Sequence, residues 1–470
     1  MSGDQTRLRE ELERRFGRET VDAEQRLSAT QPLHLDNYLQ RLLRAYSKNF
    51  SSHGDLPSGY RSSEGNVFRL PSFLLPAAGE GRVVTLEKIR PDLRERFFEV
   101  IAGERYVRFF VHPADIEHFS GFLRDARPDP RVWYASPTSS HRSLFVFEPD
   151  LPRDAGLILK VSLRRRIMGF SREIGGAQVV RAVGATAFLH QAYERSRGQL
   201  PGSGMRWFYF PEFFSFLPEG LETGGYIARA LPDGVGNDHI LLPYYALLSS
   251  RAEGSWFERL FAASGMTNRQ DFLWSQIVSP AVELFHLLAL DYGLASELHK
   301  QNLGLVVERS TGRIAGIYLR DLDALDINPV LRRTLRLEAP FEVPSWASQL
   351  GDVLRNDEAQ IGQAFDFFYF GAMNLDQLAK GLLPPREASR LLGQVNRWHL
   401  DELNRRYGVR LTRLSQISRF WEGFHRRLMK SEEFERMPAW RRRNLRWYGL
   451  LRELELTLYS LWASTSRRSS

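Results

Sequence analysis

The stretch from residue 296 to residue 322 concentrates side chains that could bind a cation and a phosphate. It reads SELHKQNLGLVVERSTGRIAGIYLRDL, with polar residues before and after an apolar middle. Carboxylate and amide oxygens are ligands for Mg²⁺, and an imidazole can carry a proton near neutral pH. A polar cluster in a loop is also the usual form of solvated surface, so both interpretations stand. The polar residues are Glu297, His299, Gln301 and Asn302 on one side and Arg320, Asp321 and Asp323 on the other.

The apolar middle of this stretch predicts a β-hairpin. LGLVV at 303 to 307 and IAGIYL at 314 to 319 are strand-like, and turn-forming residues separate them. If Glu308 pairs with Arg313, the same register sets Asn302 opposite Leu319 and Gln301 opposite Arg320. Directly opposed residues on paired strands lie about 5 Å apart. The two polar ends would therefore share one pocket rim.

A Ser- and Thr-rich turn, PTSSHRS at 137 to 143, leads into an apolar strand through Arg142. Backbone amides and hydroxyl groups in such a turn can hold a phosphate, and the arginine adds charge. A turn of this composition is more often only a turn.

Lys160 lies inside the apolar strand LILKVSL. An unpaired ammonium there would be costly, so Lys160 either faces solvent or meets an anion. A lysine that protects an edge strand from aggregation is the competing interpretation. Arg172, twelve residues on, is expected in the following helix, where its guanidinium can clamp a carboxylate or phosphate.

The elements that must position these residues form an α+β pattern. A helical N-terminal segment is expected over 1–65, a β-rich region with an antiparallel bias over 66–235, and a mostly helical region over 236–470. The aromatic run 206 to 216 is interpreted as a core strand, with an adenine-stacking platform as the alternative. His286 is expected to be a core histidine with a satisfied hydrogen bond. Helices are predicted at 5–28, 36–49, 90–101, 115–124, 164–199, 270–293, 358–380, 385–406, 411–431 and 438–462.

Composition narrows the classes of protein. The 470 residues are 43% hydrophobic and 26% charged and include no cysteine, which excludes disulfides, thiolate metal sites and a cysteine nucleophile. The formal net charge is +8, but the basic residues are spread along the chain and no nucleic-acid motif occurs, so no nucleic-acid partner is expected. Without a signal-like N-terminus or eighteen consecutive apolar residues, a cytoplasmic protein without a membrane segment is expected.

Taken in order, these segments resemble the motifs of the NRPS-independent siderophore (NIS) synthetases, the aerobactin-synthetase-like IucA/IucC family, over about residues 105 to 380. VHPADIEHF, PTSSHRS, LKVSLRRRIMGFSR, ELHKQN and YLRDLDA follow one another as in that family. The S-x-R-T turn of the family resembles residues 140–143. The family's strand lysine and later arginine correspond to Lys160 and Arg172. Its E-x-H-x-Q-N and R-D motifs match 297–302 and 320–321 completely.

The chain departs from the family pattern at several positions. Ser143 and Met168 stand where members usually have threonine, and His112-Pro113 continues as Ala-Asp. The upstream H-P-x-H-P element is missing, and Asn374-Leu375 lacks the histidine of the family's N-H-L. These differences leave the acid substrate open more than the binding of ATP.

The resemblance implies a cupped α+β fold and an ATP-dependent ligase that adenylates a citrate-like polycarboxylate and condenses it with an amine or alcohol. The implied partners are these small molecules, with ATP and Mg²⁺ as cofactors; dimers are common in the family, and the sequence leaves the oligomeric state open. Lys160, Arg172 and His299 are the implied catalytic residues, and Glu297, His299 and Arg172 would face the acid. ATP would be held by Ser140, Arg142, Ser143, Lys160, Gln301, Asn302 and Asp321, with Asn302 and Asp321 on Mg²⁺.

Two other functions fit parts of the same pattern. A small-molecule phosphotransferase also combines a strand lysine, a loop with histidine and asparagine, and a later aspartate. Against it, a kinase loop has its catalytic aspartate two residues after the histidine, where this chain has Gln301. A binding protein that kept the fold and lost turnover is the third interpretation.

Overall fold

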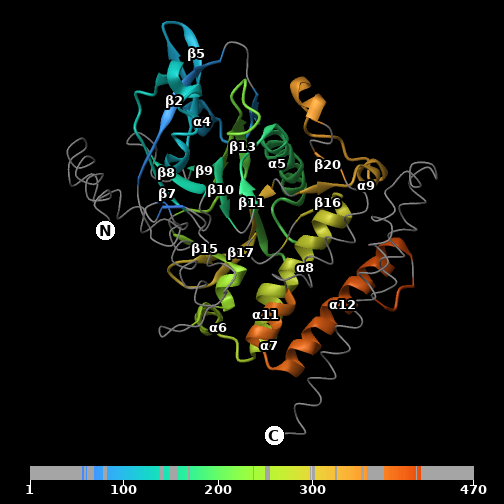
Figure 1. The fold of residues 1–470 in the computed structure, drawn as a ribbon. Coiled ribbons are helices and arrows are strands. Elements are labelled where there is room, and N and C mark those ends of the chain that lie inside the picture. The colour runs from blue at the N-terminus through green and yellow to red at the C-terminus, as the bar shows by residue number, and fades with distance from the viewer. Residues whose placement is uncertain are drawn as a thin grey trace.

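The computed structural model shows a mixed α+β protein, which confirms the predicted fold class (Figure 1). The structure describes residues 56–57, 60, 68–77, 82–137, 142–147, 157–167, 170–236, 238–248, 255–296, 298, 302–322, 325–350, 354–356, 375–408 and 410–413. The helices predicted at 5–28, 36–49 and 438–462, and nearly all of those predicted at 358–380 and 411–431, lie outside these residues.

A seven-stranded antiparallel sheet forms the centre of the fold, in the order β1-β7-β8-β9-β14-β13-β3. All residues of β9, β13 and β14 are buried, so other elements cover both faces of the sheet there. Because β9 lies between β8 and β14, the edge-strand interpretation of Lys160 is wrong. The strands are β1 (Phe68–Leu70), β3 (Val83–Thr85), β7 (Trp133–Pro137), β8 (Ser143–Phe147), β9 (Leu157–Val161), β13 (Glu212–Phe216) and β14 (Tyr226–Ala230).

The two faces of the central sheet pack against different partners. Leu157, Leu159 and Val161 of β9 join one hydrophobic cluster with the smaller sheet β4-β5-β2-β6. Ile158 of β9 points the other way, into a cluster with Phe208 and Tyr318 of the sheet β12-β18-β17-β15. Side chains alternate along a strand, so Lys160 shares the face of Ile158. The smaller sheet contains β2 (Ser72–Pro76), β4 (Phe98–Ile101), β5 (Glu104–Phe110) and β6 (Arg127–Pro128), and the other contains β12 (Arg206–Tyr209), β15 (His239–Pro243), β17 (Leu303–Glu308) and β18 (Ile314–Leu319).

The predicted hairpin is confirmed as β17 and β18, but its register shifts along its length. At the turn, the Glu308 amide donates to the Arg313 carbonyl at 2.8 Å, as expected. A β-bulge then adds Ala315 to β18, and beyond it Leu303 pairs with Leu319. The predicted pairing of Asn302 with Leu319 is therefore wrong by one residue, and Asn302 lies opposite Arg320.

Three segments predicted as helices contain other structure. Residues 90–101 form the short helix α4 (Pro91–Arg94), a 3-10 turn (Glu95–Phe97) and strand β4, because Gly103 at φ +84° permits a tight turn that pairs β4 with β5. Residues 164–172 contribute to the hairpin β10 (Leu163–Ile167) and β11 (Phe170–Arg172), and helix α5 (Gly176–Ser196) begins only after Gly175. The predicted helix 115–124 is represented by two 3-10 turns, Pro113–Asp115 and Phe122–Asp125.

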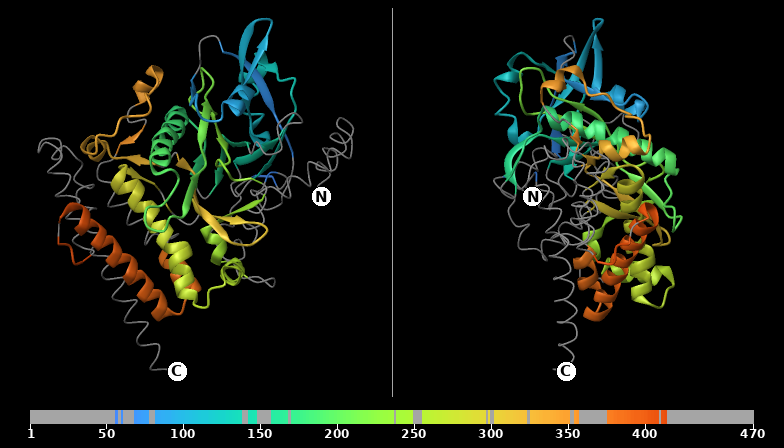
Figure 2. Two further views of the ribbon diagram at one scale, coloured as in Figure 1. Left: turned by 180° about the vertical axis from the view of Figure 1, so that it is seen from behind. Right: turned by 90° about the vertical axis from the view of Figure 1, so that its right-hand side faces the viewer.

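A long helical segment crosses the lower half of the molecule beside α12 (Figure 2). The segment Arg269–Asp291 is long and apolar enough to cross a membrane, but 78% of its most apolar window is buried inside the protein. It contains α7 (Arg269–Leu273) and α8 (Ser279–His286), and His286 Nε2 lies 2.9 Å from Nδ1 of His399 on α12 (Pro385–Tyr407). The predictions of a core histidine and of a helix at 385–406 are confirmed; α11 (Leu375–Leu382) precedes α12.

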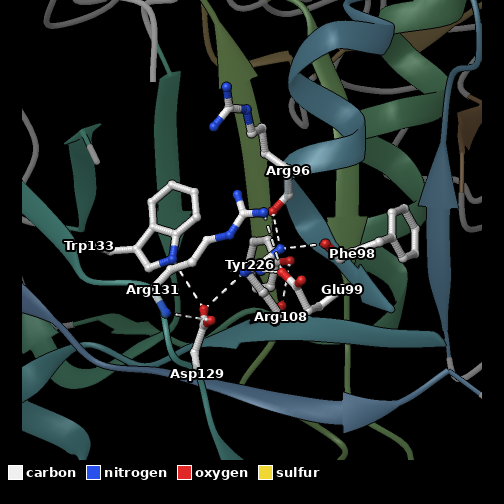
Figure 3. A network of polar contacts seen from close by, with 8 residues as sticks. All are labelled: Arg96, Phe98, Glu99, Arg108, Asp129, Arg131, Trp133 and Tyr226. Atoms are coloured by element: carbon white, nitrogen blue, oxygen red, sulfur yellow. Dashed lines mark hydrogen bonds and ion pairs between the residues drawn. The ribbon is translucent and has the colours of Figure 1, made fainter. Parts of the chain in front are cut away.

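A buried polar network joins the smaller sheet to the central sheet (Figure 3). Arg108 of β5 is fully buried, and its guanidinium donates to Asp129 at 2.9 Å and pairs with Glu99. Trp133 of β7 donates to the same Asp129 carboxylate at 3.2 Å, and Tyr226 of β14 donates to the Arg108 carbonyl at 2.8 Å. The charge of Arg108 is thus compensated, and the network links strands of the smaller sheet to strands of the central sheet.

Candidate functional site

The side chains of Lys160 and Asp321 meet between the central sheet and the sheet β12-β18-β17-β15. Lys160 projects from β9, and Asp321 follows β18 by two residues. Lys160 Nζ lies 2.7 Å from Asp321 Oδ1, although the residues are 161 positions apart in sequence. Lys160 is 3% exposed, whereas the Asp321 side chain keeps 37% of its surface exposed. The buried ammonium therefore meets an anion that solvent or a ligand can still reach.

Arg229 of β14 contacts the same carboxylate oxygen. Its Nη2 lies 3.0 Å from Asp321 Oδ1, and its Nε lies 3.2 Å from Glu212 Oε1 on β13. Arg229 is 5% exposed and Glu212 is fully buried. Burial opposes the charge on Arg229, but Glu212 and Asp321 outweigh this effect and raise the pKa of the guanidinium. Four side chains from four segments thus form one ionic network.

The electrostatics of this network favour an anionic ligand. Burial alone would raise the pKa of Asp321, but the charges of Lys160 and Arg229 hold it well below its usual range. Arg142 lies close enough to lower the same pKa further, and Arg320 lies close enough to Arg229 to oppose its charge. Among the residues that the structure describes here, cationic groups outnumber the carboxylates Asp321 and Glu212, and a phosphate or carboxylate would relieve the mutual repulsion of the cations.

The end of the predicted phosphate turn lies beside Lys160. Ser143 of β8 pairs directly with Lys160 of β9, and the Val161 amide donates to the Arg142 carbonyl at 2.9 Å. Arg142 Nη1 donates to the carbonyl of Arg172 at 2.7 Å. The sheet thus places the end of the predicted phosphate turn beside the strand that carries Lys160. The Arg142 side chain links this turn to the backbone of Arg172. Arg172 lies at the end of strand β11, so its predicted place in a helix is wrong.

Asn302 and Asp321 lie at neighbouring positions, at the open end of the hairpin. The Arg320 amide donates to the Asn302 carbonyl at 3.0 Å, and Asp321 is the next residue. Asn302 is 3% exposed. Asp321 has φ +67°, in the left-handed region that non-glycine residues seldom adopt. The strand ends just before this conformation, and the Asp321 side chain turns toward Lys160 on β9. Backbone strain of this kind is common at functional sites.

The residues present fit a magnesium ion that arrives with phosphates. Mg²⁺ commonly takes one or two carboxylates and fills its other positions with water and substrate phosphates. Asp321 offers such a carboxylate, and the surrounding cations would bind the phosphates. In the part of the chain that the structure describes, no three or more His, Asp and Glu side chains gather in a cluster that could hold a metal by itself.

Several predicted site residues fall where the structure is not described. Ser140 belongs to the phosphate turn, and Glu297, His299 and Gln301 belong to the motif that precedes β17. Their roles remain predictions, as does any effect of Met168, which also lies outside the described residues.

Arg229 and Glu212 are part of the observed network, and the sequence interpretation did not single them out. Both are charged residues in otherwise apolar strands, YIARA and EFFSF. The argument applied to Lys160, that a charge inside an apolar strand must find a partner, would have found both of them.

The aromatic run forms core strands, as predicted. Trp207, Phe208, Tyr209, Phe210, Phe213, Phe214 and Phe216 are all buried, with at most 7% of their surface exposed. Trp207 and Tyr209 pack in the large helical core, and Phe208 and Phe210 pack between the central sheet and the sheet β12-β18-β17-β15. Buried rings of this kind hold β12 and β13 in place beside the network.

Comparison with solved structures shows which proteins share this fold. Aerobactin synthetase IucC from Klebsiella pneumoniae superimposes with a TM-score of 0.56 at 16% identity, over 85% of this chain and 80% of IucC. Petrobactin biosynthesis protein AsbB from Bacillus anthracis superimposes with a TM-score of 0.57 at 15% identity, over 80% of this chain and 68% of AsbB. At the level of sequence, neither a family model nor a curated protein matches. The resemblance predicted from the motifs is confirmed at the level of the fold.

Proposed function

We propose, from a fold shared with aerobactin synthetase, that this chain is an ATP-dependent ligase of siderophore biosynthesis. It would adenylate a citrate-like polycarboxylate and pass the acyl group to an amine or an alcohol. The observation that carries the proposal is the contact of buried Lys160 with Asp321, a carboxylate that Arg229 also contacts and that keeps part of its surface exposed. The sequence interpretation assigned Lys160 and Asp321 separately to the nucleotide site, and their contact supports that assignment.

The first step of the proposed reaction brings two anions together. A carboxylate oxygen of the acid attacks the α-phosphorus of ATP, the bond to the β-phosphate oxygen breaks, and pyrophosphate leaves. Lys160, Arg142 and Arg172 would offset the repulsion between acid and nucleotide and stabilise the charge that develops on the phosphate oxygens. In the second step the amine or hydroxyl attacks the acyl carbon, loses its proton, and AMP leaves.

The remaining predicted residues take complementary roles in this proposal. Ser140 and Ser143 would donate to phosphate oxygens, and Gln301 and Asn302 would contact the nucleotide. Asp321 and Asn302 would hold Mg²⁺, which supplies Lewis-acid stabilisation of the phosphates when bound. Glu297, His299 and Arg172 would face the acid, with His299 able to donate to its carboxylate.

A hydroxylamine assay tests the proposal and the substrate class together. The protein is incubated with ATP, Mg²⁺, hydroxylamine and one of citrate, succinate, 2-oxoglutarate or a larger carboxylate, and hydroxamate, AMP and pyrophosphate are measured. A ligase gives acid-dependent hydroxamate with equal amounts of AMP and pyrophosphate. Formation of ADP with a phosphorylated acceptor would establish the phosphotransferase instead, and binding without any product would establish the non-catalytic relative.

A further inference from the structure

We infer that Arg229 positions the Asp321 carboxylate, so that Lys160 remains available to a bound phosphate, and that buried Glu212 holds Arg229 in place. This inference rests on the ligase function proposed above. It assigns Arg229 and Glu212 as positioning residues, because each acts through another side chain and neither is proposed to touch the reacting atoms.

The geometry shows that one carboxylate oxygen is shared by two cations. Lys160 and Arg229 lie on the adjacent strands β9 and β14, and both contact Asp321 Oδ1, at 2.7 Å and 3.0 Å. The cross-strand partner of Lys160 is Ile227, two residues before Arg229, so the two side chains leave the same face of the sheet. Because both contacts converge on Oδ1 and the side chain is partly exposed, the rest of the carboxylate is directed away from the two cations.

Arg229 is anchored on its other side. Both its Nε and its Nη2 contact Glu212 Oε1, and the amide of Glu212 donates to Thr186 Oγ1 on α5 at 2.9 Å. The guanidinium is planar and can span two acceptors at once, which an ammonium cannot do in the same way. Since Arg229 and Glu212 are almost completely buried, water cannot replace either partner. The orientation of Asp321 is therefore set from the core.

The sharing of Oδ1 has a consequence for phosphate binding. When the Lys160 ammonium turns toward a phosphate, Arg229 still neutralises Asp321. Without Arg229, Lys160 would be the principal counter-ion of Asp321 and would be held on the carboxylate, because separating this pair would leave a buried charge uncompensated. Loss of Arg229 should therefore weaken nucleotide binding even though Lys160 and Asp321 are both present.

The test measures binding of Mn²⁺·ATP by calorimetry, with the bound Mn²⁺ followed by electron paramagnetic resonance. Arg229→Gln should bind Mn²⁺·ATP about 10- to 100-fold more weakly than the wild type, the range expected when one charged hydrogen bond is lost. Arg229→Lys should recover part of this loss, since it restores the charge without the two-acceptor geometry. In the hydroxylamine assay the KM for MgATP should rise more than the KM for the acid.

Two further variants separate positioning from folding. Glu212→Gln keeps the volume of Glu212 and removes only its charge, so a smaller loss of affinity is expected in a folded protein. Arg332→Gln removes another buried arginine, which donates to the Tyr292 carbonyl and to Gln191 outside the network, and should leave Mn²⁺·ATP affinity unchanged.

The outcomes are distinguishable. Equal affinity of wild type, Arg229→Gln and Glu212→Gln would overturn the positioning role and leave the ligase proposal intact. An equal loss in Arg332→Gln would also overturn it, because the effect would then follow from any buried arginine. Absence of Mn²⁺·ATP binding in the wild type would overturn the proposed function and this role together.

Discussion

Lys160 is buried in the middle of a sheet, and an ammonium in that position is stable because Asp321 meets it. Asp321 is in turn neutralised by Arg229, so the removal of either Lys160 or Asp321 leaves part of the network paired. A buried ion pair is weak evidence for stability by itself. Its position beside a predicted phosphate turn is the reason to assign it a function.

At the residue scale, Lys160→Ala and Asp321→Ala should each lower hydroxamate formation by at least about 100-fold, the scale observed when one donor to developing charge is removed. Both variants should remain folded by circular dichroism, because Arg229 keeps Glu212 as a partner in each. Asp321→Ala should be the less stable of the two, because buried Lys160 loses its contact with the carboxylate. Lys88→Ala is the matched control, since Lys88 is an exposed lysine outside the network. Near-wild-type activity of either site variant would refute the assignment of these residues.

At the scale of elements, the hairpin and the central sheet together position the charged residues of the site. Strand β18 lies between β17 and β12 and ends at the residue before Arg320 and Asp321. Its parallel neighbour β12 leads through Phe210 and Pro211 to Glu212, and the Phe210 amide donates to the Leu319 carbonyl at 3.0 Å. The spacing of β12 and β18 therefore determines where Glu212 and Asp321 stand relative to Arg229.

Gly316 permits this close approach of β12 and β18. A Cβ at position 316 would lie 2.5 Å from the Arg206 carbonyl oxygen, which is backbone and cannot rotate away. Gly316→Ala should therefore separate the strands, lower stability by about 1–3 kcal/mol as overpacking does, and reduce Mn²⁺·ATP binding. Gly121→Ala is the control, because a Cβ there meets nothing within 4 Å and the backbone φ is −64°. Equal melting temperatures for the two variants would contradict the proposed constraint.

At the scale of the whole molecule, the fold joins a β-rich half to a helical half that packs around α8 (Figure 1). The contact between α8 and α12 includes the stacked, hydrogen-bonded pair of His286 and His399. Burial and the charges of Arg406 and Arg405 lower the pKa of His286 to about 3. His286 therefore stays neutral in the folded protein at pH values where an unfolded chain would protonate it.

The pH dependence of unfolding should report this histidine. The unfolded imidazole titrates near pH 6.5 and the folded one near 3, so the stabilising contribution is present above pH 6.5 and is lost as pH falls toward 3. Between pH 7 and pH 5 the free energy of unfolding should fall by about 2 kcal/mol because of His286. His286→Gln keeps an amide that can pair with His399 and should show a correspondingly smaller fall, measured by denaturant unfolding at both pH values. The exposed His118 provides the control, since His118→Gln should keep the wild-type dependence.

Apolar periodicity and turn residues are local properties, and they were sufficient to predict the fold class and the hairpin. That the hairpin and the strand of Lys160 belong to one site was predicted from the order of the motifs. The same locality explains the errors. The bulge at Ala315 depends on how β18 pairs with two neighbours, and the hairpin that carries Arg172 depends on partners that a helical pattern does not reveal.

What the sequence alone determined is which charged residues must find partners, namely those placed inside apolar strands. Only the tertiary structure decided that Lys160, Arg229 and Asp321 converge on one carboxylate oxygen and that Glu212 anchors Arg229 from behind. The physical reason is that charge compensation in a buried site depends on the distances between the charged groups. Arg229 and Lys160 lie 92 and 161 positions from Asp321 in the sequence, and they come within contact distance of it only when the sheets pack.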